Sequence, residues 1–248
     1  VYADVLSGEQ LGISCIPEPG YIFSHWEVTK KPEIDSAIID RGDVWKYLVS
    51  SGPPSDNWMT LTYDDNIWAT GNAEFGYGDG DEKTLIGYGG NSQSKYITSW
   101  FRKNFNIRNK KDFTRFTLHL LRDDGARVYV NGMEVIRDNM DRWSVGSYSP
   151  ALEDVSGKDE SYFYTFQLNP ALFQEGENVI AVEIHQSSAS SPDISFDLDL
   201  VAASLKDGSS NTIFENKLWL TMTNYTAVTE HLISDKKNIE KVFINEVM

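Results

Sequence analysis

Apolar residues alternate with polar ones in short runs along most of this chain, which is the period of a half-buried β-strand. In one run Phe116, Leu118 and Leu120 fall on one face, while Thr117 and His119 fall on the other. No segment keeps the 3.6-residue period of a helix over three turns. Gly, Pro and Asp turns separate the runs, so the pattern predicts an all-β protein, a β-sandwich. Further runs of this kind are 96–107, 162–168, 180–185 and 194–200.

Residues 121–135 carry two turn signals between strand-like runs. Asn131-Gly132 is the dipeptide favoured in a two-residue type I′ hairpin, because both central residues need positive φ. Asp123-Asp124-Gly125 has the composition of a second turn. We therefore expect neighbouring strands here, with the acidic turn projecting from the edge of their sheet.

Changes of composition along the chain predict four parts. Lys and Pro mark a first linker, and Gly and Ser mark a second one. The expected parts are a small β unit over 1–30, a linker over 31–42, a sandwich over 43–206, and a segment over 207–248. That last segment is expected to hold a linker, one extra strand and the start of a following domain.

The chain is acidic, with 37 Asp and Glu against 22 Lys and Arg and a net charge of −15. Phosphate binding needs a basic surface, so we expect no nucleic-acid partner and no anionic membrane surface. The acidic residues lie in short loops rather than in one tail. They favour either a soluble surface or a calcium-binding one.

Cys15 is the only cysteine, so the chain has no intramolecular disulfide and no Cys-based zinc site. No apolar run approaches the roughly 20 residues of a membrane span, so we expect no transmembrane segment. No signal peptide begins at Val1, and both ends fall in strand-like sequence. We therefore expect this chain to be a piece of a longer protein. We also expect it to be a monomer.

A glycine-rich stretch over 71–90 contains the candidate metal ligands Asp79, Asp81 and Glu82, to which we add Asp193. The stretch lacks the Gly-Lys-Ser/Thr spacing of a phosphate loop and the twelve-residue pattern of an EF-hand. Two interpretations remain: a loop wrapped over a sheet edge, or a structural calcium site. Calcium is the one cofactor that the sequence suggests.

The candidate ligand-binding residues centre on the acidic turn. They are Arg122, Asp123 and Asp124, together with His185 and Gln186. Carboxylates offer hard oxygen ligands to calcium, while Arg and His donate hydrogen bonds to sugar hydroxyls. The alternative is a salt-bridged turn that caps the hairpin.

Aromatic residues make up 12% of the chain and include seven Trp. Aromatic faces stack on sugar rings, so exposed rings would suit a carbohydrate ligand, although a single Trp is more often buried in a core. The candidate rings, with Trp100 and Trp143 foremost, are Trp68, Tyr77, Tyr88, Trp100 and Trp143.

Catalytic signatures are absent from the sequence. Its four His residues form no Ser-His or His-Glu-x-x-His pattern, so we expect no enzyme. A glycosidase would need two carboxylates about 5–10 Å apart in a cleft, and Asp124 with Glu183 is the first pair to test for that alternative.

The middle of the chain resembles a known family. The motifs include Arg-Asp-Asp-Gly at 122–125, Val-Tyr-Val-Asn-Gly at 128–132, Ile-Ala-Val-Glu-Ile-His-Gln at 180–186 and Asp-Ile-Ser-Phe-Asp-Leu at 193–198. Together they resemble the galactose-binding-like jelly-roll module of bacterial secreted multidomain proteins. The Asn-Gly hairpin is also similar to one in the sugar-binding domain of family 2 glycosidases.

Shorter resemblances flank this module. Pro-Glu-Pro-Gly-Tyr-x-Phe-x-x-Trp at 17–26 resembles the end of internalin-type β-repeats of bacterial surface proteins, which act mostly as spacers. Val-Phe-Ile-Asn-Glu-Val-Met at 242–248 resembles the first strand of a lamin-tail domain. This order of parts is similar to that of CotH-type surface proteins.

The resemblance implies a jelly-roll sandwich with a small β appendage before it and a short strand segment after it. It implies a non-catalytic, carbohydrate-binding-like module, secreted or on the bacterial cell surface, whose partners are a glycan and the neighbouring domains of its own chain. Modules of one fold differ in ligand, so a structural spacer or protein-interaction module without a glycan remains the alternative.

Overall fold

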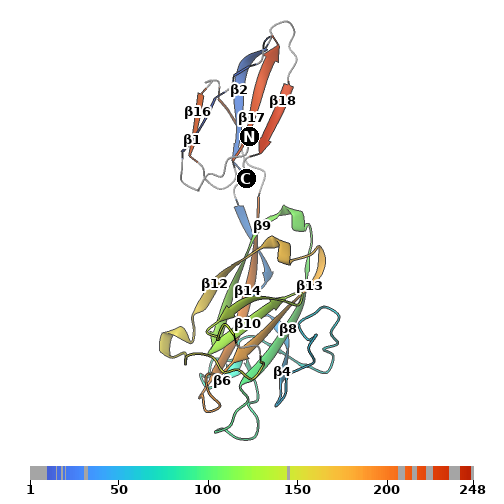
Figure 1. Cartoon of the computed structure of the whole chain (residues 1–248), viewed down its shortest axis with the longest axis vertical. Coiled ribbons are helices and arrows are strands. Elements are labelled where there is room, and N and C mark those ends of the chain that lie inside the picture. The colour runs from blue at the N-terminus through green and yellow to red at the C-terminus, as the bar shows by residue number, and fades with distance from the viewer. Residues whose placement is uncertain are drawn as a thin grey trace. The chain divides into compact units, whose positions relative to one another are not determined.

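The structure is a computed structural model that describes residues 34–204 apart from 144 and 145. Outside that range it describes residues 14, 16, 17, 19 and 21–26, and the backbone of the remaining strands. The chain divides into two compact units, one formed by 35–203 and the other by 1–34 with 204–248. Figure 1 shows the strands of both units.

The smaller unit is built from both ends of the chain. Its four-stranded antiparallel sheet has the order β15-β2-β17-β18, and β1 pairs with β16 beside it. Trp26 of β2 is buried and packs on Phe23, with 5.3 Å between the ring centroids. The strands are β1 (Gln10–Ser14), β2 (Tyr21–Lys30), β15 (Ser210–Ile213), β16 (Lys217–Thr221), β17 (Thr226–Ser234) and β18 (Lys241–Glu246).

These pairings divide the chain differently from the four expected parts. Residues 1–30 and 207–248 were expected as separate segments, but β2 pairs with both β15 and β17. The expected linker over 31–42 contains strand β3 (Glu33–Ile39), which pairs with β14, and its Ile39 is buried in the sandwich core. The lamin-tail-like segment lies largely in β18, while Val247 and Met248 lie outside the described residues.

The larger unit is a sandwich of two largely antiparallel sheets, so the prediction of an all-β sandwich is confirmed. The first sheet has the order β11-β10-β13-β8-β4-β5, and the second has the order β12-β9-β14-β6-β7, with β3 beside β14. The strands are β4 (Val44–Val49), β5 (Ala69–Asn72), β6 (Phe75–Tyr77), β7 (Thr84–Leu85), β8 (Thr98–Ile107), β9 (Phe113–Asp123), β10 (Gly125–Val130), β11 (Met133–Asp138), β12 (Phe163–Leu168), β13 (Gly176–His185) and β14 (Ile194–Leu205).

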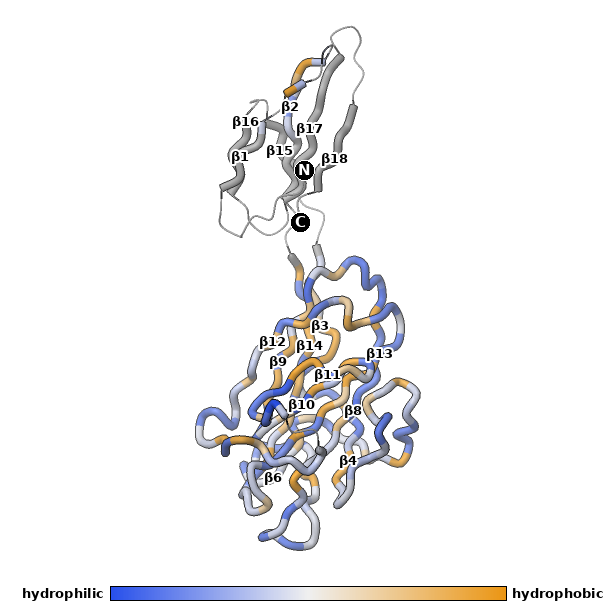
Figure 2. Tube along the Cα trace, viewed as in Figure 1, coloured by the Kyte–Doolittle hydropathy of each residue, from blue (hydrophilic) through white to orange (hydrophobic). Residues whose placement is uncertain are grey.

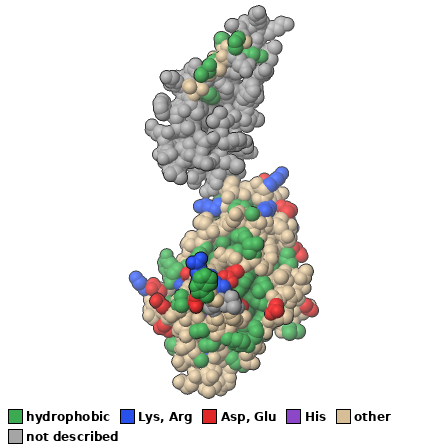
Figure 3. Space-filling model, in the orientation of Figure 1, with side chains coloured by type: hydrophobic (Ala, Val, Ile, Leu, Met, Phe, Trp, Pro, Cys, Tyr) green, Lys and Arg blue, Asp and Glu red, His purple; other side chains and the backbone are tan. Residues whose placement is uncertain are grey.

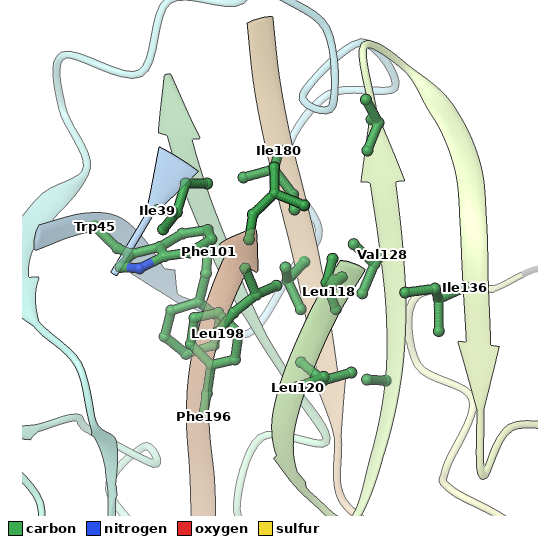
Figure 4. Close-up of a cluster of buried hydrophobic side chains, with 14 of the residues drawn as sticks. Ile39, Trp45, Phe101, Leu118, Leu120, Val128, Ile136, Ile180, Phe196 and Leu198 are labelled. Atoms are coloured by element: carbon green, nitrogen blue, oxygen red, sulfur yellow. The ribbon is translucent and has the colours of Figure 1, made fainter. Parts of the chain in front are cut away.

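The core lies between the two sheets, where their inner side chains interdigitate (Figure 4). Phe101 of β8 packs on Phe196 of β14 with 4.3 Å between the ring centroids. The alternation of β9 is as predicted, since Leu118 and Leu120 are fully buried and His119 is only half-buried. Figure 2 shows apolar positions along the strands of the sandwich and hydrophilic ones in its loops.

A second apolar cluster lies on the outer face of the first sheet. Trp100 of β8 and Tyr129 of β10 are covered there by Trp58 and Trp68 from the loop between β4 and β5. The rings of Trp58 and Trp68 stack at 6.2 Å. The face that sequence alternation would leave open to solvent is therefore closed by a loop.

The β10–β11 hairpin has the predicted turn, with positive φ at both Asn131 (51°) and Gly132 (89°). The prediction for the acidic turn is wrong. Strand β9 belongs to the second sheet and β10 to the first, so the Asp123–Asp124 segment crosses between the sheets instead of projecting from an edge. Both Asp side chains are fully buried as a result.

No helix in the described part of the chain is long and apolar enough to cross a membrane.

Candidate functional site

The candidate residues of the acidic turn meet at one end of the sandwich. Gly125, the first residue of β10, pairs with His185, the last residue of β13. The backbone N–H of Asp124 donates to the carbonyl of His185 at 3.3 Å. The structure thus places His185 and Gln186 beside the turn, although about 60 residues separate them from it in the sequence.

Arg122 and Asp124 are buried and fasten the surrounding backbone. Arg122 donates from Nε to Asp138 Oδ2 at 2.7 Å and from Nη1 to the Asp124 carbonyl at 2.6 Å. The Asp124 carboxylate accepts from the N–H of Val155 on one oxygen and of Ser187 on the other, both at 2.7 Å. Neither side chain faces solvent, so both hold loops at this end of the sandwich.

His185 belongs to a buried polar network with Glu183. Its Nε2 lies 3.2 Å from Glu183 Oε2, and its Nδ1 lies 2.8 Å from the Ser149 carbonyl. Burial acts to raise the pKa of Glu183, but the hydrogen bond from His185 and the charges of His185 and Arg127 outweigh it and lower that pKa. Glu183 is thus a buried carboxylate, and neither it nor Asp124 opens onto a cleft that a glycosidase would need.

The aromatic candidates separate into buried and exposed rings. Trp100 and Trp68 are buried in the cluster under the loop between β4 and β5. Tyr77 is half-buried and packs edge-on against Tyr88. Trp143 is 80% exposed, and its neighbour Arg142 lies 5.3 Å above the ring. Figure 3 shows hydrophobic side chains at several separate places on one face of the sandwich, next to acidic ones.

Three of the candidate metal ligands meet in the loop after β6. Ligand atoms of Asp79, Asp81 and Glu82 lie within 4.8 Å of one another. The Glu82 carboxylate, however, already accepts from the N–H groups of Asp79 and Gly80, both at 3.0 Å. The fourth candidate, Asp193, abuts Gly78, where an added Cβ would lie 2.6 Å from the Cβ of Asp193. All four predicted ligands therefore lie in one region.

An acidic pocket of about 240 Å³ lies beside this loop and includes Asp79 and Asp81 among its lining residues. Burial, together with repulsion from neighbouring carboxylates, raises the pKa of both Glu74 and Asp79. The lining residues are Glu74, Asp79, Asp81, Gly157, Glu160 and Ser161. Hard oxygen donors of this kind suit calcium better than zinc or copper, which prefer nitrogen and sulfur.

Sequence reasoning missed a second polar site, a groove of about 480 Å³ on the outer face of the second sheet. Asp199 of β14 accepts there from Arg41 Nε and lies against His119 Nδ1, both at 2.5 Å. Arg41 also stacks over Phe163 at 3.7 Å. Alternation places His119 and Asp199 opposite the apolar residues of their strands. No signal in the sequence predicted that β9 and β14 are neighbours.

No protein-family profile matches this chain, and no curated protein matches it in sequence. Solved structures with a similar arrangement include a β-glucuronidase from an uncultured Clostridium species, with 11% identity and a TM-score of 0.43 over 87% of this chain and 45% of that one. A β-glucuronidase from glycoside hydrolase family 2 has 13% identity and a TM-score of 0.41, over 88% of this chain and 30% of that one. The Ruminococcus gnavus β-glucuronidase has 8% sequence identity and a TM-score of 0.40, over 87% of this chain and 45% of that one.

The chain spans less than half the length of these enzymes. It is a β-sandwich that resembles part of family 2 β-glucuronidases at low identity. At such identities and TM-scores the likeness carries no argument about activity or ligand.

Proposed function

We propose that residues 35–203 form a non-catalytic module that binds carbohydrate through Trp143. The exposed Trp143 ring carries the proposal, because Trp is highly buried on average and an exposed indole face is available for stacking on a ligand ring. Sugar rings present apolar faces that stack on indole, with hydroxyl edges that remain available for hydrogen bonds.

The backbone around Trp143 is held in place. Arg137 of β11 donates from Nη1 to the carbonyl of Asp141 at 2.8 Å, and the Asp141 carboxylate accepts from the Trp143 N–H at 3.0 Å. The exposed rings of Tyr148 and Tyr162 lie on the same long connection between β11 and β12. A ring on a fixed backbone loses less conformational entropy when a ligand binds, which favours affinity.

The resemblance of residues 43–204 to galactose-binding-like modules supports the same proposal. It also suggests that the module belongs to a secreted or surface-exposed bacterial protein. The burial of Glu183 and Asp124 supports a non-catalytic role, since these two carboxyls would be the first pair expected to act on a glycosidic bond.

The proposal is tested by a glycan array, followed by calorimetry with the best polysaccharide on the full chain. Trp143→Ala should weaken binding about fivefold or more, because a ligand ring stacked on an aromatic side chain contributes roughly 1–3 kcal/mol and 1.4 kcal/mol is a factor of ten. Its melting temperature should stay that of the wild type, since the ring takes no part in the described core.

Met133→Ala is the matched control, because Met133 is an exposed apolar residue in the β10–β11 hairpin. It should leave the affinity unchanged. Equal loss in both variants, or loss in neither, would contradict the proposed role of Trp143.

A spacer or protein-interaction module is the second candidate. The burial of Trp68, Trp100 and all the candidates around the acidic turn favours it, because these residues then serve the fold. An array without any glycan signal from polysaccharides or monosaccharides would select this candidate.

A further inference from the structure

Two buried side chains at the end of the sandwich have acceptor oxygens without a donor. Asp123 and Gln186 are both 0% exposed. Within the described residues, no N–H or O–H group reaches either carboxylate oxygen of Asp123 or the amide oxygen of Gln186. A buried carboxylate without a partner is strongly destabilising. We therefore expect these oxygens to bind a group that the described residues do not provide.

The side chains of Asp123 and Gln186 lie next to residue 193. Burial and the neighbouring carboxyls of Asp124 and Asp193 raise the pKa of Asp123, which makes Asp193 a neighbour of that buried side chain. Gln186 donates from Nε2 to the Asp193 carbonyl at 2.6 Å and to the Tyr77 hydroxyl at 2.9 Å, so its side chain lies against residue 193. Asp124 also adjoins Asp123, but the N–H groups of Val155 and Ser187 already occupy its two oxygens.

No described Lys or Arg pairs with Asp123 or Asp193. Lys95 is the cation beside Tyr77, and its ammonium group donates to the carbonyls of Ser191 and Pro192 instead. Asp79 and Glu160 add further negative charge next to Asp193. The electrostatic potential around Asp123 and Asp193 is therefore strongly negative and favours a bound cation.

We propose that Asp123 and Asp193 bind a divalent cation of the calcium class inside this end of the sandwich, with Gln186 Oε1 as a neutral ligand. Carboxylate and amide oxygens are the ligands that calcium takes, in irregular sets of six to eight that include water. Asp193 is only half-buried, so this side of the site is open to solvent.

This site differs from the exposed loop trio of Asp79, Asp81 and Glu82. In the loop, backbone N–H groups already occupy the carboxylate of Glu82. In the interior, the oxygens of Asp123 have no other described partner. The bound cation would neutralise two carboxylates that otherwise repel each other across the junction of β9, β10 and β14, so we expect it to stabilise the fold without touching a glycan.

The test is calorimetric titration of calcium chloride into the chelator-treated full chain, paired with thermal unfolding in calcium and in EDTA. We expect one calcium per chain and a melting temperature about 5 °C or more higher in a hundredfold excess of calcium over Kd. Asp193→Asn should raise Kd at least about tenfold, because it removes a charged ligand. Asp193 is half-buried at the rim, so this variant folds more readily than one at Asp123.

Asp81→Asn is the matched control, since it removes one carboxylate from the exposed trio and none from the interior site. It should keep Kd within about threefold. Binding lost in Asp81→Asn and kept in Asp193→Asn would place the cation in the loop and overturn the proposal. Equal melting temperatures in calcium and EDTA, without binding heat, would overturn it too, and would leave a proton shared by Asp123 and Asp193 as the partner.

Discussion

At the scale of single residues, buried carboxyl groups in this sandwich differ in what surrounds them. The Asp197 side chain on β14 accepts from the Gly42 N–H on both oxygens, at 3.2 and 3.0 Å, and from the Leu198 N–H at 2.7 Å. Burial outweighs these bonds and raises the pKa of Asp197 to about 6. The neutral form is therefore favoured in the folded state relative to the unfolded chain.

The raised pKa predicts how Asp197 changes stability with pH. The folded state binds this proton more tightly than the unfolded chain does, so protonation of Asp197 stabilises the fold. The contribution is fully present below about pH 4 and is lost as pH rises through 6. The loss amounts to about 3 kcal/mol, since one pKa unit corresponds to about 1.4 kcal/mol. Urea unfolding of the wild type and Asp197→Asn at pH 4 and pH 7 measures it.

We expect the free energy of unfolding of Asp197→Asn, relative to the wild type, to rise between these two pH values. Every other titrating group is shared by the two proteins, so their difference isolates Asp197. Parallel pH curves for the two proteins would refute this account.

At the scale of elements, the crossing from β9 to β10 organises one end of the sandwich. Only glycine fits at the start of β10, since a Cβ on Gly125 would lie 2.8 Å from Met140 Sδ and 2.9 Å from both the Ala151 Cβ and the Asn139 carbonyl. The connection between β11 and β12 closes over the turn at that place. Close packing of the connection on the turn buries the two Asp side chains.

Gly125→Ala should destabilise the fold by about 1–3 kcal/mol, the usual effect of overpacking a filled interior. Gly87→Ala is its control, because no atom lies within 4 Å of a Cβ there, and it should change stability by less than about 0.5 kcal/mol. Chemical unfolding of both variants decides the matter. A Gly125→Ala protein as stable as Gly87→Ala would show that the connection moves aside freely.

At the scale of the whole molecule, the net charge of −15 decides which partners can approach. A polyanion would be repelled at long range, because association with nucleic acid depends on Lys and Arg that displace counterions. A neutral polysaccharide meets no such barrier, which agrees with the proposed ligand class.

The chain should therefore show no shift of a double-stranded DNA fragment in a gel at about 50 mM salt, where electrostatic binding is strong. Glycan binding should vary little between about 50 and 500 mM salt, because stacking and neutral hydrogen bonds are not screened. Strong salt dependence of glycan binding would point instead to the Arg41, His119 and Asp199 groove as a site for a charged sugar.

Features that depend on neighbouring residues could be predicted from the sequence. The alternation in β9 predicted which side chains enter the core, and Asn131-Gly132 predicted the hairpin turn, because periodicity and turn chemistry are local. Three features could be seen only in the folded chain: the two chain ends share a sheet, the Asp123–Asp124 turn is buried between sheets, and His119 contacts Asp199. Those features arise from strand pairings between distant segments, which no local pattern encodes.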